Sequence, residues 1–177
     1  MKKDARIWIY VISVLAIVLD RVSKLWINQH VPLGGGITVI PKVFRISHVL
    51  NFGAAFSIFG QSTSPERVRL GLIAFSVIAV IIVAIAIWRI GREWTPAGVG
   101  LGLILGGALG NLYDRAVLHY VIDFLEVHIG SYHWPDFNIA DSCICVGAAL
   151  LMIEIIWPRE KTDSSSTPRN DNAVVDH

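Results

Sequence analysis

Long uncharged apolar segments constrain this chain more than any other feature of its sequence. Leu70 to Trp88 and Thr95 to Tyr113 contain no charged residue, and each is long enough, at roughly 20 residues, to cross a bilayer as a helix. Over the whole chain 54% of the residues are hydrophobic and 16% are charged, and the hydrophobic residues are grouped in runs. The sequence therefore predicts an all-α polytopic membrane protein.

Two further segments have the length of a span but carry charges. Ile139 to Trp157 contains Asp141 and Glu154, and the apolar run Ile7 to Leu19 continues through charged residues to Ile27. No small-x-small cleavage site follows that first run, so we interpret it as a retained anchor and not as a secretory signal. We therefore predict four transmembrane helices, at about 7–27, 70–88, 95–113 and 139–157.

Composition predicts one integral-membrane domain, 1–157, and a polar tail, 158–177, which is too poor in apolar residues to bury a core and is expected to be disordered. Lys2, Lys3 and Arg6 precede the first span, and cytoplasmic loops carry an excess of such residues. Both termini are therefore expected in the cytoplasm. The net charge is only +1, and the sequence has no basic stripe that could bind nucleic-acid phosphates. We therefore expect no nucleic-acid partner.

The two outer loops, about 28–69 and 115–137, are expected to form a small cap that contains β-structure. The β-branched stretch from Ile37 to Leu50 fits a pair of strands. Residues 51–59, NFGAAFSIF, resemble the start of a short interfacial helix. VIDFLEVHIG, at 121–130, fits either a short strand or an interfacial helix, and the aromatic residues after it fit anchoring at the membrane surface.

The third span carries a glycine at every fourth position, namely Gly98, Gly102, Gly106 and Gly110. This spacing lays a ridge of hydrogen atoms along one helix face, which lets another helix approach closely. We interpret the ridge as a packing feature and give these glycines no catalytic role.

Polar residues are expected to meet at the outer ends of the spans, because four crossings return the end of span one, both outer loops and the start of span four to one side. Asn111 precedes Asp114 and Arg115 by three and four residues, so these side chains share one part of a helix. The set at this end is Asp20, Asn51, Asn111, Asp114, Arg115, Asp123, Asn138 and Asp141. Such a set is what a polar pocket near the interface requires.

Many of these residues also have a purely structural interpretation. Asn138 can cap the fourth helix, and Asp20 can pair with Lys24 four residues later. Asp114 and Arg115 can lie among lipid headgroups. These interpretations stay open on the sequence alone.

Asp141 is harder to explain structurally, because it lies in the first turns of an apolar helix with no basic residue nearby in sequence. Asp123 becomes a candidate catalytic residue because it can pair with Asp141, whereas Asp136 is interpreted as a solvated loop acid. Two carboxyl groups held close share one proton, so that the ionised group activates water while the protonated group polarises a carbonyl. Such a pair hydrolyses a peptide bond without a cofactor, and we predict no metal in the site.

Other chemistries stay open. The sequence has no HExxH and no G-x-S-x-G motif, but His119, His128 and His133 form a possible metal set with Asp123. A small proton-coupled transporter would relay protons through Asp20, Asp114 and Asp141. A non-catalytic membrane scaffold would account for the glycine ridge alone.

Five motifs in order resemble those of bacterial lipoprotein signal peptidases, the type II signal peptidases. They are LDRVSKLW (19–26), LNFGAAFSIF (50–59), GGALGNLYDR (106–115), VIDF (121–124) and FNIADS (137–142). The resemblance covers nearly the whole chain except the polar tail. It implies an aspartyl endopeptidase of the bacterial inner membrane, active near the periplasmic face. The implied partners are prolipoprotein substrates, which are cut just before a cysteine that carries diacylglycerol, and the membrane lipids around them.

The same resemblance implies roles for individual residues. By position in the motifs, Asp123 and Asp141 are the catalytic pair, which agrees with the pairing inferred from topology. The residues implied to bind substrate or to orient the site are Asn51, Asn111, Arg115 and Asn138, with Arg115 toward substrate carbonyls and Asn138 holding Asp141. Those implied to support the structure are Asp20, Lys24 and Asp114. The sequence leaves the oligomeric state open.

Overall fold

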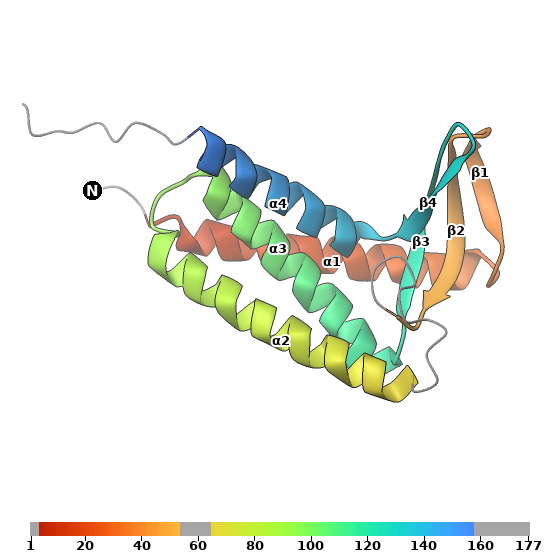
Figure 1. The fold of residues 1–177 in the computed structure, drawn as a ribbon, viewed down its shortest axis with the longest axis horizontal. Helices are drawn as coiled ribbons and strands as arrows, with labels where there is room; N and C mark the ends of the chain where they lie inside the picture. Colours follow the sequence, from red (N-terminus) through yellow and green to blue (C-terminus); the bar gives the residue numbers. More distant parts are fainter. Residues whose placement is uncertain (1–3, 54–64, 158–177) are drawn as a thin grey trace, which may run out of the picture.

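The structure is a computed structural model and describes residues 4–53 and 65–157. Within these residues, four long helices lie side by side, and an antiparallel sheet stands across one end of the bundle (Figure 1). The helices are α1 (Arg6–His30), α2 (Pro65–Ile90), α3 (Pro96–Tyr113) and α4 (Ile139–Ile156), with a π-helical turn, η2 (Asp114–Leu118), after α3. The strands are β1 (Gly36–Ile40), β2 (Phe44–Asn51), β3 (Val121–Ile129) and β4 (Tyr132–Phe137).

Three helical segments among the described residues are long and apolar enough to cross a membrane, namely Glu66–Ile90, Pro96–Leu118 and Ile139–Ile156. Their outer surfaces are apolar as well, since Phe75 on α2 is 72% exposed and Ile155 on α4 is 70% exposed. Lipid covers such surfaces in membrane proteins. Three of the predicted spans are thus confirmed as apolar helices. α1 has the length of a span, at 25 residues, but carries Asp20, Arg21 and Lys24.

The glycines of α3 bring two other helices close to it. A Cβ atom added at Gly106 would lie 2.6 Å from the carbonyl oxygen of Ser13 in α1. The predicted ridge is therefore confirmed as a packing surface. A second face, which the sequence analysis missed, packs on α4, where a Cβ atom at Gly100 would lie 2.6 Å from the carbonyl oxygen of Gly147.

Both outer loops contribute to a single sheet with the strand order β1-β2-β3-β4. The predicted strand pair is confirmed as β1 and β2, and the ambiguous stretch at 121–130 forms β3. β4 was not predicted, because Pro135 argues against a strand. The sheet accepts it because β4 is an edge strand and its register shifts between Trp134 and Phe137, so Pro135 is not paired in the ladder.

The C-terminal end of α1 anchors the sheet to the bundle. Ile27 and Val31 pack against Ile122 and Phe124, and all four are buried. Alternation along β3 then turns Asp123, between those two residues, toward the other face of the sheet. Asn51, where the predicted interfacial helix starts, is instead the last residue of β2. The rest of that stretch beyond Gly53 and the predicted disordered tail lie outside the described residues.

Candidate active site

A buried ion-pair network joins α1 to the end of α3. The ammonium group of Lys24 lies 2.8 Å from a carboxylate oxygen of Asp20 and 2.7 Å from one of Asp114, and all three side chains are fully buried. Arg21 pairs with the other carboxylate oxygen of Asp114. Two cations therefore balance two carboxylates, which is the condition under which buried charges are tolerated.

Asp20 also fixes the start of α4. Its second carboxylate oxygen accepts a hydrogen bond from the backbone N–H of Ala140 at 3.0 Å, in the first turn of that helix. The approach requires a glycine opposite, because a Cβ atom at Gly110 would lie 2.9 Å from Asp20 Oδ2. The ion-pair network thereby sets the position of the residue that follows Ala140, which is Asp141.

Asp141 is held by two asparagines. Asn138 caps α4 by accepting the Asp141 backbone N–H at 3.0 Å, and Asp141 Oδ2 accepts the Asn138 backbone N–H at 3.3 Å. Asp141 Oδ1 accepts a hydrogen bond from Asn111 Nδ2 at 2.8 Å. The structural interpretation of Asn138 as a helix cap is thus correct, and the same contacts orient the carboxyl group of Asp141.

Asp123 lies on β3 and is also held by two asparagines. Its Oδ1 accepts from Asn138 Nδ2 at 2.8 Å, and its Oδ2 accepts from Asn51 Nδ2 at 2.9 Å. Asn51 lies beside it because β2 pairs Asn51 with Val121, two residues before Asp123. Asn138 therefore contacts the carboxyl groups of both aspartates.

One cavity of about 530 Å³ has both aspartates in its wall. Its polar lining also includes Arg115, whose guanidinium donates to the Asn111 carbonyl oxygen at 3.4 Å. Most of the wall is apolar, which suits a ligand that presents apolar groups to a few fixed polar atoms. The apolar residues and the cysteine in this wall are Val121, Trp134, Phe137, Ile144 and Cys145.

Burial raises the pKa of the Asp123 carboxyl group to about 7, and the neighbouring charge of Asp141 acts in the same direction. Hydrogen bonds from Asn51 and Asn138 oppose this rise, but they do not cancel it. Near neutral pH, Asp123 is therefore able to hold a proton beside a second carboxyl group.

All nine residues singled out from the sequence lie in this region, and hydrogen bonds or ion pairs link each of them to at least one of the others. Arg21 was missed, although its place beside Asp20 in the LDR triplet was a signal. The interpretation of Asp136 as a solvated loop acid is wrong. It lies in β4 with a side chain only 17% exposed, accepts a hydrogen bond from Ser47 and lines the cavity.

The alternative histidine set is not brought together around Asp123. His128 and His133 lie near Glu126 instead. His119 follows η2 in a left-handed conformation with φ of 73°.

Comparison with known proteins agrees with this picture. A family model described as signal peptidase (SPase) II matches residues 12–157. A lipoprotein signal peptidase of Solibacter usitatus is 39% identical over 163 residues, which cover 92% of this chain and 99% of that protein. One of Pseudomonas putida is 41% identical over 157 residues, which cover 88% of this chain and 90% of that protein.

The fold is also found in a solved structure, described as a bacterial membrane enzyme determined by the in meso method at 2.3 Å resolution. It is 28% identical, gives a TM-score of 0.79, and the match covers 91% of this chain and 98% of that one. The helices and these matches define a membrane-bound peptidase. The chain belongs to the signal peptidase II family. A peptidase family is therefore supported in place of the transporter and the scaffold considered from the sequence.

Proposed function

We propose that this protein removes the signal peptide from bacterial prolipoproteins whose cysteine carries diacylglycerol, and that Asp123 and Asp141 act together as its catalytic pair. The observation that carries the proposal is the position of Asn138, which hydrogen-bonds both carboxyl groups at the wall of one cavity. The names of the relatives support the substrate class.

In the proposed reaction, Asp123 carries the shared proton and Asp141 is ionised. Asp141 takes a proton from a water molecule while the water oxygen attacks the carbonyl carbon before the cysteine, and Asp123 donates its proton to the carbonyl oxygen. Asp141 then gives its proton to the departing nitrogen as the C–N bond breaks. A hydroxyl of the tetrahedral intermediate returns the proton to Asp123, which restores the starting state.

The other polar residues have positioning roles in this proposal. Arg115 hydrogen-bonds substrate carbonyl oxygens at the cavity wall, while Asn51 and Asn111 orient the carboxyl groups and the substrate. The network of Asp20, Lys24 and Asp114 holds the start of α4 through the hydrogen bond from the Ala140 backbone N–H to Asp20. These side chains position the pair or the substrate and take no part in the proton transfers.

We further propose that α1 is the fourth transmembrane helix. Its buried charges Asp20 and Lys24 are neutralised within the bundle, so lipid does not meet them. The start of α1 and the connection from α2 to α3 lie at the end of the bundle opposite the sheet (Figure 1). These segments carry Arg6, Arg89 and Arg92, as expected of a cytoplasmic end. Both termini are then cytoplasmic, and the cavity opens near the periplasmic face of the inner membrane.

Membrane lipid explains the preference for a diacylated substrate. Two acyl chains in the outer leaflet hold the modified cysteine at the depth of the cavity, and each buried methylene adds about 0.8 kcal/mol of membrane affinity. An unmodified precursor lacks this anchor and is expected to be cut poorly.

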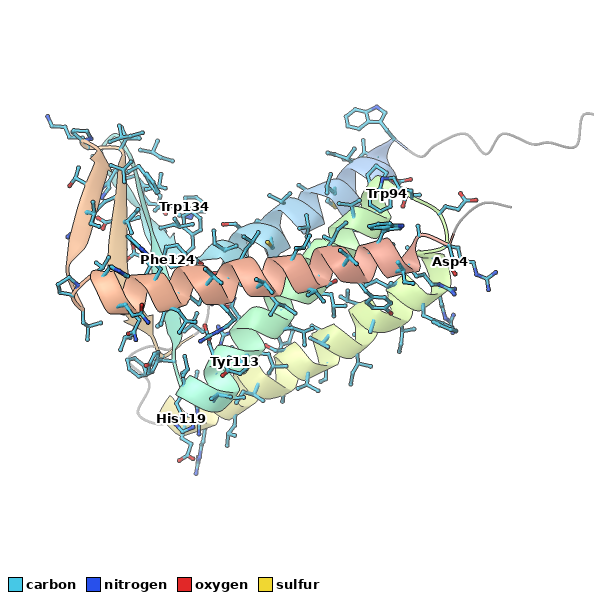
Figure 2. The ribbon with its side chains drawn as sticks, turned by 180° about the vertical axis from the view of Figure 1, so that it is seen from behind. Asp4, Trp94, Tyr113, His119, Phe124 and Trp134 are labelled. Atoms are coloured by element: carbon cyan, nitrogen blue, oxygen red, sulfur yellow. The ribbon has the colours of Figure 1, made fainter. Side chains whose placement is uncertain are left out.

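The test compares cleavage of a diacylated and an unmodified precursor by purified protein in micelles, with products identified by mass spectrometry. We expect Asp123→Asn and Asp141→Asn each to lower the rate at least about 10³-fold without unfolding the protein. Asp4→Asn is the matched control, because this exposed carboxylate lies at the opposite end of the bundle (Figure 2). Full cleavage by either site variant would overturn the catalytic assignment, and equal cleavage of both precursors would overturn the lipid preference.

A further inference from the structure

Two histidines and a glutamate meet on the hairpin of β3 and β4. His128 pairs directly across the ladder with His133, and the two imidazole rings lie 4.8 Å apart, centre to centre. Glu126 is two residues before His128, so its side chain points to the same face of the sheet. Its Oε1 lies 2.8 Å from His128 Nε2 and 3.9 Å from His133 Nε2.

These distances suit a metal ion. Zinc binds imidazole nitrogen and carboxylate oxygen at about 2.0–2.2 Å, which places two tetrahedral ligand atoms about 3.3 Å apart. The separations from Glu126 Oε1 to the two imidazole nitrogens fall on either side of that value, and all three ligand atoms lie within 4.8 Å of one another. The imidazoles have room to rotate toward a common ion, since the His133 side chain is 49% exposed and that of His128 is 35% exposed.

The surroundings orient the carboxylate for such a role. Arg45 donates to Glu126 Oε2 at 3.1 Å, which leaves Oε1 facing the two imidazoles. Second contacts of this kind are typical of metal-binding carboxylates. Asp136 lies on the far side of His133, with its Oδ1 3.8 Å from His133 Nε2, and is placed to act as a fourth ligand or to hold a bound water.

We propose that Glu126, His128 and His133 bind a divalent transition-metal ion, with Zn²⁺ as the best match to two imidazoles and a carboxylate. The three proposed ligands are not among the residues that line the cavity of the catalytic pair, although the neighbouring Asp136 is. Along β3, Glu126 and His128 lie on the face of the sheet opposite to Asp123. Ile122 and Phe124 lie on the same face as Glu126 and His128, and they pack against α1. A bound ion would tie β3 to β4 near the tip of the hairpin.

The test is calorimetric titration of the full chain in micelles with ZnCl₂, after purification with a tag that contains no histidine and removal of metals by chelator. We expect one saturable site per chain, and MgCl₂, which prefers oxygen ligands, should not compete for it. His133→Ala should weaken zinc binding at least about tenfold. Glu126→Gln, which keeps the size of the side chain, should weaken it similarly.

His30→Ala is the matched control, because His30 is an exposed histidine on α1 whose imidazole bonds to the Trp26 carbonyl oxygen and stacks on the Trp26 ring. It should leave the zinc affinity unchanged. Zinc should also raise the Tm of the wild type and not that of His133→Ala. Unchanged zinc affinity in His133→Ala and Glu126→Gln, or a wild-type Kd weaker than about 1 mM, would overturn the proposal.

Discussion

Among the residues that the structure describes, neutral amides form the hydrogen bonds to the two carboxyl groups of the proposed pair. Each carboxyl oxygen of Asp123 and Asp141 accepts a hydrogen bond from an asparagine. A cation in direct contact would favour ionisation of both groups, whereas an amide fixes their geometry and leaves one proton to be shared. Asn111 lies between Lys24 and Asp141, since its Oδ1 accepts a hydrogen bond from the Lys24 ammonium group at 3.1 Å and its Nδ2 donates one to Asp141.

Replacing Asn138 with alanine should affect both stability and catalysis. The variant loses the cap of α4, worth about 0.5–2 kcal/mol, and the side-chain contact with Asp123. We expect a lower Tm and a cleavage rate reduced at least about tenfold in protein that is still folded.

Thr95→Ala is the matched control for Asn138→Ala. Thr95 caps α3 at the opposite end of the bundle by accepting the Gly98 backbone N–H at 2.9 Å. It should lower the Tm by a similar amount and leave cleavage by the folded protein unchanged. Equal loss of activity in both variants would show that Asn138 acts only through stability.

The raised pKa of Asp123 predicts the pH dependence of cleavage. The carboxyl group holds its proton up to about pH 7, and above that value the pair has no proton to donate to the carbonyl oxygen. The rate should therefore fall above pH 7, approaching tenfold for each further pH unit. A rate that stays constant or rises from pH 7 to about pH 9 would contradict the role of Asp123 as proton donor.

The sequence predicted the site residues better than their surroundings. Asp141 was identified because an acid in the first turns of an apolar helix requires partners from elsewhere in the fold, and Asp123 because of its place beside Asp141 in the topology. Asp136 was misjudged, because nothing local indicates that a strand would place it between Ser47 and His133.

At the scale of the elements, α3 is packed by α1 and α4 through glycines on two of its faces. The glycines at every fourth position of α3 predicted a packing face, which is the face that contacts α1. The α4 face was missed because its glycines, Gly100 and Gly107, are seven residues apart and meet a glycine and an alanine on α4. β4 was missed for a different reason, since the ladder tolerates Pro135 only through an irregularity that depends on β3.

Gly106→Leu should separate α1 from α3. The added side chain would meet the carbonyl oxygen of Ser13, a backbone atom that moves only if α1 moves with it, and overpacking of this kind costs about 1–3 kcal/mol or more. Thermal unfolding in micelles should show a clear fall in Tm. Gly71→Leu on α2 is the control, because a Cβ atom there meets nothing within 4 Å, and it should be tolerated.

At the scale of the whole molecule, the proposed orientation puts the sheet outside and the chain ends inside. Figure 2 places Asp4 and Trp94 at one end of the bundle and Phe124 and Trp134 at the other. In a Cys143→Ser, Cys145→Ser background, a membrane-impermeant thiol reagent should label Ser131→Cys in intact spheroplasts. It should label Asp4→Cys only after the membrane is opened. The reverse pattern would invert the topology.

The central claim is that Asp123 and Asp141 work as one catalytic unit. Its most direct test measures single-turnover cleavage of a diacylated precursor by Asp123→Asn, Asp141→Asn and the double variant. Residues that act as a unit are strongly non-additive, so the double variant should be no more than about threefold slower than either single variant. A double variant whose loss equals the product of the two single losses would show that the two carboxyl groups act independently.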